Sequence, residues 1–268
     1  FLKKSNFYKP SFAQNISQGN QLDYVILGSS MGLTTLNTKL IDSLTGFNGV
    51  NLSMDDTALA THYLMLKHFL KQGGNTKRVI LTISPWDISN DSPQIGDNDY
   101  RFIPFISENY VASHFEELKK NDQHPIPLSS YLPMYGLGYY NVELFYPSLI
   151  SVIKPDYRNR FDDRGNYVYP SSNFQSEKYK SISYNFTIKN RYLFKLKELC
   201  DKHEIKFIIY QSPIYKGNYK ADLSNKKNFI NDMDIFNGNP DLFYDRIHVN
   251  KKGRAKATKL FVDQFIDI

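Results

Sequence analysis

The chain has 268 residues, of which 41% are hydrophobic and 22% are charged, and it contains one cysteine. This length supports one large hydrophobic core or two small ones, and a single cysteine excludes both an intrachain disulfide and a cysteine-rich metal site. The formal net charge of +6 is spread over many short lysine clusters. We therefore expect a mildly basic surface and no nucleic-acid-binding role. Binding of another anionic polymer remains a possible role.

The first part of the sequence alternates predicted strands with predicted helices. Residues 1–21 are polar and irregular, and we interpret them as a lead-in segment. Short apolar runs rich in β-branched residues predict buried strands, and segments with apolar residues on one helical face predict helices. In chain order we expect a strand at 22–27, a helix at 33–44, a weaker strand at 46–52, a helix at 57–71 and a strand at 78–83.

The alternation stops after the third strand and resumes near the C-terminus. Residues 88–183 are rich in Tyr, Phe, Pro, Asn and Asp, and we interpret them as a long insertion within a single domain over 22–268. After the insertion we expect a helix at 185–203, a strand at 206–210, a short helix at 225–232 and a closing helix at 251–265. This order predicts a three-layer α/β/α sandwich with a parallel, flavodoxin-like sheet of four or five strands.

Two serines directly follow the first predicted strand, in the sequence Gly28-Ser29-Ser30. A serine in a strand-to-helix turn can act as a nucleophile, because the N–H groups of the first helical turn point toward an approaching carbonyl oxygen. Serines are also common helix caps, so this motif by itself allows a purely structural role. Catalysis further needs a base that removes the hydroxyl proton during the attack.

A candidate base lies near the C-terminus, in the sequence Asp245-Arg246-Ile247-His248. An imidazole can accept a proton from a serine on one ring nitrogen while it donates a hydrogen bond to a carboxylate from the other. Asp245, three residues before His248, is placed to orient that ring. The alternative is a turn-forming aspartate beside a surface histidine, since residues 250–253 also favour a turn.

The predicted topology brings these candidates to one edge of the sheet. Ligands of open parallel sheets bind beyond the carboxyl ends of the strands. The candidate polar residues all follow predicted strands at that edge, and they are Ser30, Ser53, Ser84, Gln211, Asp245 and His248. We therefore expect the Ser30 hydroxyl and a ring nitrogen of His248 to lie within about 2.6 to 3.2 Å of each other.

Together the two motifs resemble the SGNH (GDSL-like) hydrolase superfamily. In that family a serine in the first sequence motif, which follows the first strand, is the nucleophile. An Asp-x-x-His motif near the C-terminus supplies the other two residues of the catalytic triad. The resemblance covers both ends of the core and implies these roles for Ser30, Asp245 and His248, with Ser29 at the position of the family's usual Asp. The Gly-Ser-Ser block is similar to the divergent branch that includes alginate and peptidoglycan O-acetyltransferases and the D-alanyl transfer protein of teichoic acid synthesis.

Two further blocks depart from the family pattern. Ser53 stands where the family has a glycine whose N–H helps to hold the oxyanion, and its own backbone N–H can still serve. Trp86 replaces an Asn that normally donates to the oxyanion. The indole N–H of Trp86 is also a hydrogen-bond donor. The alternative is that its ring only packs against neighbouring side chains. Loss of one such donor lowers the rate by about a hundredfold to a thousandfold.

The resemblance implies an esterase or O-acyl transferase that works through an acyl-enzyme, with an ester-bearing small molecule or a bacterial surface polysaccharide as its substrate. One alternative is a catalytically degenerate module of the same fold that binds glycan or cell-wall polymer. Another is a non-hydrolytic, flavodoxin-like domain that binds a partner. We expect no cofactor and no metal, because His62 and His68 fall on different faces of their predicted helix.

We expect a monomer that works outside the cytoplasm, in the periplasm or at the cell surface. No apolar run in the sequence is long enough to span a bilayer. The chain starts at Phe1 rather than Met, so we expect a preceding segment, for which a membrane anchor or an export signal is one hypothesis.

Overall fold

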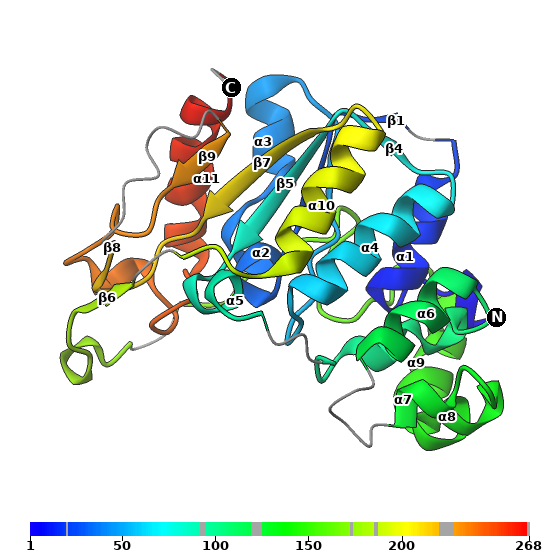
Figure 1. Ribbon diagram of the computed structural model, residues 1–268. Helices are drawn as coiled ribbons and strands as arrows, with labels where there is room; N and C mark the ends of the chain where they lie inside the picture. Colours follow the sequence, from blue (N-terminus) through cyan, green and yellow to red (C-terminus); the bar gives the residue numbers. More distant parts are fainter. Residues whose placement is uncertain are drawn as a thin grey trace.

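A parallel sheet of five strands forms the centre of the protein (Figure 1). The computed structural model describes residues 1–19, 21–91, 95–118, 125–171, 174–184, 187–219 and 228–266. The strand order is β3-β2-β5-β7-β9, and every neighbouring pair is parallel. The strands are β2 (Tyr24–Leu27), β3 (Gly49–Asn51), β5 (Arg78–Ile83), β7 (Lys206–Gln211) and β9 (Phe229–Asn231). The predicted sheet is therefore confirmed.

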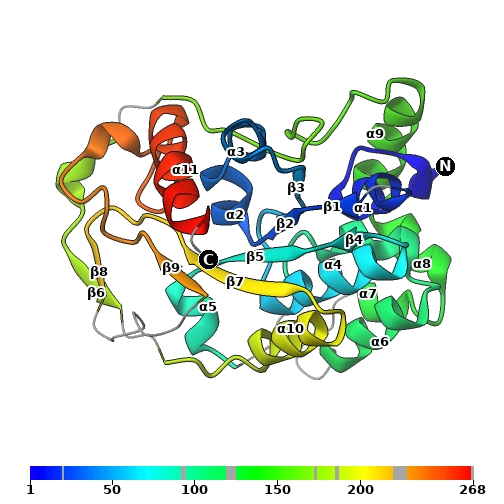
Figure 2. The ribbon, with the colours of Figure 1, turned by 90° about the horizontal axis from the view of Figure 1, so that it is seen from above.

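Helices cover both faces of this sheet (Figure 2). One face carries α2 (Ser30–Thr35), α3 (Thr38–Thr45) and α11 (Lys251–Ile266), and the other carries α4 (Leu59–Lys71) and α10 (Arg191–Lys202). A further helix, α1 (Lys9–Ser17), packs against α4. This arrangement confirms the predicted three-layer α/β/α sandwich.

The two faces of the sheet belong to two different hydrophobic clusters. Side chains along a strand alternate between the faces, and in β2 the side chains of Val25 and Leu27 join the cluster under α4 and α10. Between them, Ile26 joins the second cluster, together with Ile41 of α3 and Phe261 of α11. Because both faces are buried, the strands consist of nearly continuous apolar runs, which is why the sequence predicted them well.

Three local expectations are corrected by the structure. Residues 1–21 are not an irregular lead-in, because α1 buries Phe12 and Ala13 in the core. The helix expected at 33–44 is split into α2 and α3, since side chains distant in sequence bind the backbone at the junction: the Thr258 hydroxyl accepts from the N–H of Asn37, and Asn166 accepts from that of Thr38. The helix expected at 225–232 is wrong over 229–231, which form β9, while 225–227 lie outside the described residues.

In the residues that the structure describes, the insertion contains short helices and the strand β6 (Ile182–Tyr184). Its elements are α5 (Pro85–Ser89), η2 (Asp99–Phe105), α6 (Asn109–Leu118), α7 (Pro125–Leu128), α8 (Pro133–Tyr139), α9 (Asn141–Ile153), η4 (Ser176–Lys178) and β6. Helices α6 to α9 lie at the end of the molecule that carries the N-terminus (Figure 1). The strand β6 pairs with β8 (Gly217–Tyr219), and β1 (Gln21–Leu22) pairs with β4 (Asn75–Thr76). Two further short helices are η1 (Leu2–Lys4) and η5 (Pro240–Leu242).

None of the helices in the described ranges combines the length and the apolar character that a bilayer-spanning helix needs. Of the helix expected at 185–203, residues 185 and 186 lie outside the described ranges, residues 187–190 are not helical, and α10 begins at Arg191, where Asn190 caps it by accepting a hydrogen bond from the N–H of Tyr192.

Candidate active site

Ser30 is the first residue of α2, just beyond the carboxyl end of β2. Gly28 allows the turn between them, because a Cβ on this residue would lie 2.9 Å from the carbonyl oxygen of Thr82 in β5. Only a glycine can pass so close to the neighbouring strand. The turn leaves the side chain of Ser30 partly exposed at the edge of the sheet.

Asp245 and His248 lie in the loop between η5 and α11. One carboxylate oxygen of Asp245, Oδ1, accepts hydrogen bonds from the N–H groups of Ile247 and His248, both at 2.9 Å. The N–H of Tyr244 donates to the carbonyl oxygen of His248 at 2.8 Å. These bonds close the loop into a tight turn and leave the second carboxylate oxygen, Oδ2, directed at the imidazole.

Three side chains from opposite ends of the sequence form one continuous chain of hydrogen bonds. The Ser30 Oγ lies 2.8 Å from His248 Nε2, and His248 Nδ1 lies 2.8 Å from Asp245 Oδ2. An ionised carboxylate can only accept, so Nδ1 carries the proton that it donates to Asp245, and Nε2 can accept from the Ser30 hydroxyl. This is the geometry of a Ser-His-Asp triad. The predicted distance between Ser30 and His248 is confirmed.

The surroundings of Asp245 favour its ionised carboxylate. Burial opposes the ionisation of Asp245, but hydrogen bonds from the His248 ring and from the N–H groups of Ile247 and His248 outweigh it and lower the pKa of the carboxyl group. Asp245 is therefore ionised at neutral pH. His248 is only 9% exposed, so a positive charge on the imidazole would be stabilised mainly by this carboxylate.

An aromatic ring of the insertion, that of Tyr169, covers the imidazole together with Tyr244 of the triad loop between η5 and α11, and the sequence did not single out this pair. The ring of Tyr169 lies 5.1 Å from that of His248 and stacks on Tyr244 at 4.2 Å, with an angle of 12° between the rings. A β-bridge between Tyr169 and Asn250 fixes the backbone there. Burial raises the pKa of Tyr169 to about 12. The only signal in the sequence was the general richness of the insertion in tyrosine.

The backbone N–H of Ser53 does not have the role expected for it. It donates to Asn51 Oδ1 at 2.9 Å, and Ser53 is 1% exposed. The amide nitrogen of Asn51 donates in turn to the carbonyl oxygen of Gly32 at 2.9 Å, which ties β3 to α2. The N–H groups of Ser30 and Met31 lie in the first turn of α2, where no intrahelical acceptor is available. These two N–H groups are the backbone donors that lie nearest in sequence to the Ser30 hydroxyl.

Trp86 is an exposed residue on the short helix α5, which follows β5 directly. Its side chain is 43% exposed, and the ring lies 6.2 Å from that of Tyr184. The start of α5 is fixed by a hydrogen bond from the Ser84 hydroxyl to the carboxyl group of Asp87 and by one from the Asn190 amide to the carbonyl oxygen of Asp87 at 3.0 Å. Trp86 therefore offers a firmly placed aromatic surface.

The hydroxyl of Ser30 opens into a shallow pocket with a volume of about 400 Å³. The pocket is lined by residues that follow β2 and β3, by residues of α5 and the insertion, and by one residue of the triad loop: Ser29, Ser30, Met31, Asp56, Thr57, Ala58, Trp86, Asp87, Ile95, Gly96, Asp97 and Ile247. Its titratable side chains are all carboxyl groups, so the pocket favours neutral or cationic molecules over anionic ones. Ser29 lines the pocket beside Ser30, and its hydroxyl makes no capping bond to α2.

Two of the residues expected at this edge are structural instead. The hydroxyl of Ser84 is bound to Asp87, and the amide of Gln211 donates to the carbonyl oxygen of Ser212 at 2.8 Å. Both side chains are buried, and neither lines the pocket around Ser30. They stabilise the ends of β5 and β7, which hold the loops of the site in place.

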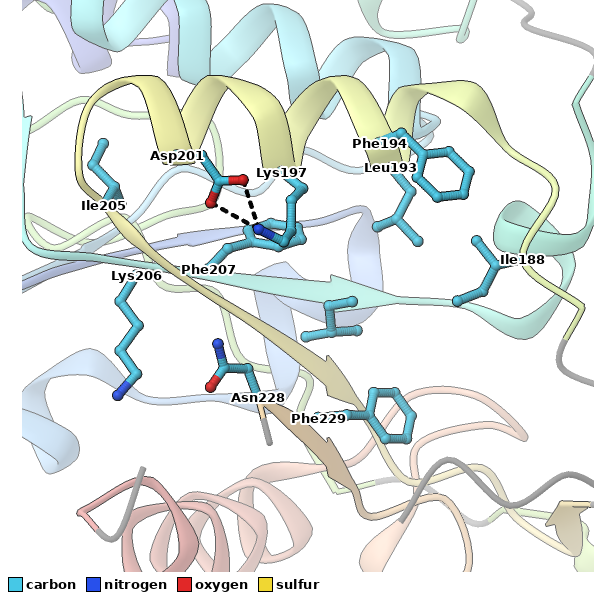
Figure 3. A pocket seen from close by; sticks show the side chains of 11 residues that line it. Ile188, Leu193, Phe194, Lys197, Asp201, Ile205, Lys206, Phe207, Asn228 and Phe229 are labelled. Carbon is cyan, nitrogen blue, oxygen red and sulfur yellow. Dashed lines mark hydrogen bonds and ion pairs between the residues drawn. The ribbon is translucent and has the colours of Figure 1, made fainter. Parts of the chain in front are cut away.

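A second and more apolar pocket, of about 490 Å³, lies between α10 and the strands β7 and β9 (Figure 3). Its lining is mostly aliphatic and aromatic, and its ionic groups include the pair formed by Lys197 and Asp201 at 2.6 Å. No member of the triad lines this pocket. The pocket therefore offers volume but lacks the hydroxyl–imidazole–carboxylate chain found at Ser30.

The described part of the chain holds no group of three or more His, Cys, Asp or Glu side chains arranged to bind a metal. His62 and His68 are buried separately, and desolvation lowers the pKa of His62 to about 3 and that of His68 to about 4.

Comparison of the chain with protein-family models gives no match, and comparison with curated protein sequences gives none. The functional assignment therefore depends on the geometry of the site.

Proposed function

We propose that the protein is a serine-dependent ester hydrolase or O-acyl transferase that works through an acyl-enzyme on Ser30. The observation that carries this proposal is the pair of 2.8 Å contacts that link Ser30, His248 and Asp245. A serine hydroxyl that donates to a nearly buried imidazole, with an ionised carboxylate behind it, is activated for attack on a carbonyl carbon.

The proposed reaction has two steps. The Ser30 oxygen attacks the carbonyl carbon of the ester while its proton moves to His248 Nε2, and the imidazolium is held by Asp245. The tetrahedral intermediate then expels the alkoxide, which takes the proton from Nε2, and an acyl-Ser30 ester remains. In the second step an acceptor hydroxyl gives its proton to Nε2 and attacks the acyl carbon, and the new tetrahedral intermediate expels the Ser30 oxygen, which takes the proton back from Nε2. The acceptor is water in an esterase and a sugar hydroxyl in a transferase.

The N–H groups of Ser30 and Met31 support the proposal as oxyanion donors. They lie in the first turn of α2, where the partial positive charge of the helix end adds to their effect. The side-chain donor of the resembled family is replaced by Trp86, and the N–H of Ser53 is occupied by Asn51. With fewer donors than the family normally has, we expect a slow or highly selective enzyme.

Carbohydrate is the substrate class that we favour. The pocket is shallow, Trp86 offers an aromatic face suited to packing against a sugar ring, and an acetyl group is small enough for the space beside Ser30. The likeness of the Gly-Ser-Ser block to polysaccharide O-acetyltransferases supports the same substrate and, with it, a location outside the cytoplasm.

The test is covalent labelling with a fluorophosphonate, which reacts with activated serines. We expect mass spectrometry of the digested protein to find one adduct, on the peptide that contains Ser30. Ser30→Ala should abolish labelling and His248→Ala should lower it by about a hundredfold or more. Ser29→Ala is the matched control, because this neighbouring serine has no bond to His248, and it should label normally. Labelling that persists in Ser30→Ala would refute the proposal.

A second candidate function is glycan binding without catalysis. The occupied N–H of Ser53 and the exposed ring of Trp86 favour it, since together they suit a binding surface with a weakened oxyanion site. In that case titration calorimetry would detect an acetylated oligosaccharide whose binding is lost in Trp86→Ala and is unchanged in Ser30→Ala. The fluorophosphonate would then leave the wild-type protein unlabelled.

A further inference from the structure

The outward surface of α8 and α9 is apolar, although these helices lie on the outside of the molecule. Met134, Val142 and Ile153 are 75%, 76% and 73% exposed. The same surface includes further large apolar or aromatic side chains, namely Leu132, Tyr135, Tyr139, Phe145, Tyr146, Leu149 and Val152. A cluster of this kind is unusual on a soluble monomer, and it marks a surface that contacts something apolar.

Helix α9 has the reverse of the normal arrangement of a surface helix. Its inward side contains Leu144, Ser148 and Ser151, all buried, and the hydroxyl of Ser151 accepts a hydrogen bond from the N–H of Asn6 at 3.1 Å. Its outward side contains the long aliphatic and aromatic residues. A helix in water normally turns its apolar side inward, so the outward side of α9 is built for an apolar environment.

The charges around this surface indicate which environment that is. From residue 125 to residue 153 the only charged side chain is Glu143. Exposed lysines lie beside this stretch, since Lys154 follows α9 and Lys4 belongs to η1, which packs against α9, while the exposed carboxylate of Asp156 nearby is paired with Arg158 at 3.3 Å. Tyrosines with polar tips are distributed among the aliphatic side chains. Apolar residues, tyrosines and flanking lysines form the composition of surfaces that enter the interface of an anionic bilayer.

The size of α9 fixes how such a surface would meet a bilayer. At 1.5 Å per residue its 13 residues span about 20 Å, whereas the hydrocarbon core is about 30 Å thick. The helix can therefore lie along the interface but cannot cross it. Figures 1 and 2 show α8 and α9 at the end of the molecule opposite α11 and β9.

We propose that the outward side of α8 and α9 is a membrane-docking surface, which inserts its apolar side chains into the interface of an anionic lipid bilayer. Contact with a second copy or with another protein explains the composition less well. Protein interfaces share the tyrosine, phenylalanine and methionine of this surface, but they are also enriched in arginine, and residues 125–153 contain no arginine. The proposal does not depend on the chemistry at Ser30.

The test is co-sedimentation of the purified chain with vesicles, either of phosphatidylcholine alone or of phosphatidylcholine and phosphatidylglycerol in equal parts. We expect binding to the mixed vesicles, weaker binding to the neutral ones, and a further loss at high salt. In Met134→Glu, Val142→Glu and Ile153→Glu, each of which replaces a fully accessible side chain, we expect the partition coefficient to fall by about tenfold or more. The triple variant should remain in the supernatant.

Leu44→Glu and Leu260→Glu are the matched controls, because they make the same change at exposed leucines of α3 and α11 on another side of the molecule. They should bind as the wild type does. Circular dichroism should show that every variant is folded. The proposal is overturned if the wild type binds neither kind of vesicle, or if the triple variant binds as well as the wild type. It is also overturned if light scattering shows that the wild type is a dimer and the triple variant a monomer, while neither protein binds vesicles.

Discussion

We expect Asp245→Asn to remove most of the catalytic activity while the fold stays intact. The change is isosteric, but it replaces one carboxylate oxygen by an NH₂ group. Asp245 Oδ1 accepts two backbone N–H groups at 2.9 Å, and Oδ2 accepts from His248 Nδ1 at 2.8 Å. The asparagine oxygen must take the position of Oδ1, because an NH₂ group there would face two N–H donors. The NH₂ group is then left facing the imidazole.

This orientation puts the imidazole in the wrong tautomer. Nδ1 can meet an NH₂ group only as an acceptor, so the proton of the neutral ring moves to Nε2. A protonated Nε2 donates to Ser30 and cannot take its proton. The same change in a serine protease triad lowers turnover by about ten-thousandfold. Here we expect a loss of about a thousandfold to ten-thousandfold, equivalent to about 4 to 5.5 kcal/mol of transition-state stabilisation.

The assay is steady-state hydrolysis of p-nitrophenyl acetate, with kcat/KM as the readout and a thermal melt to show that the variant is folded. Asp97→Asn is the control, because it makes the same chemical change at an exposed carboxylate of the same pocket. We expect its rate to stay within about threefold of the wild type. If Asp245→Asn keeps more than about a tenth of the wild-type kcat/KM, the tautomer argument is refuted.

Three further predictions concern contacts around Tyr169, Gly32 and Asp99. Tyr169→Ala should lower kcat by about tenfold because it uncovers the catalytic imidazole, whereas Tyr169→Phe should stay within about twofold because the ring makes the contact; equal losses in steady-state assays would contradict this. A Cβ on Gly32 would lie 2.6 Å from the Ser53 hydroxyl, so Gly32→Ala should destabilise the fold by about 1 to 3 kcal/mol in urea unfolding. Adding Ser53→Gly should restore most of that stability, and no recovery would count against the clash. Burial raises the pKa of Asp99 from 3.8 to about 7, so the folded state keeps a proton that the unfolded chain releases, and this residue makes stability fall as pH rises from about 4 to about 7. Thermal melts of Asp99→Asn should show a smaller decline over that window, and an identical decline would rule out this assignment.

The sequence contained enough local information to predict the sheet and the position of the candidate residues. Apolar runs such as 22–27 and 78–83 are buried on both faces, and this requirement is visible in composition alone. In a parallel sheet the carboxyl ends share one edge, so the order of the strands already placed Ser30 near the loop of Asp245 and His248. The same reasoning could not separate the buried Ser84 and Gln211 from the residues that line the pocket, since all of them follow strands.

Only the tertiary structure determined which donors and aromatic rings surround the triad. The N–H of Ser53 is occupied because the side chain of Asn51 folds back onto it, and Tyr169 covers His248 because a bridge to Asn250 holds it there. Likewise β9 is a strand through its pairing with β7, despite a sequence that favoured a helix. Strand periodicity is a local property of the chain, whereas these contacts join segments that are distant in sequence, so their energies depend on the folded arrangement alone.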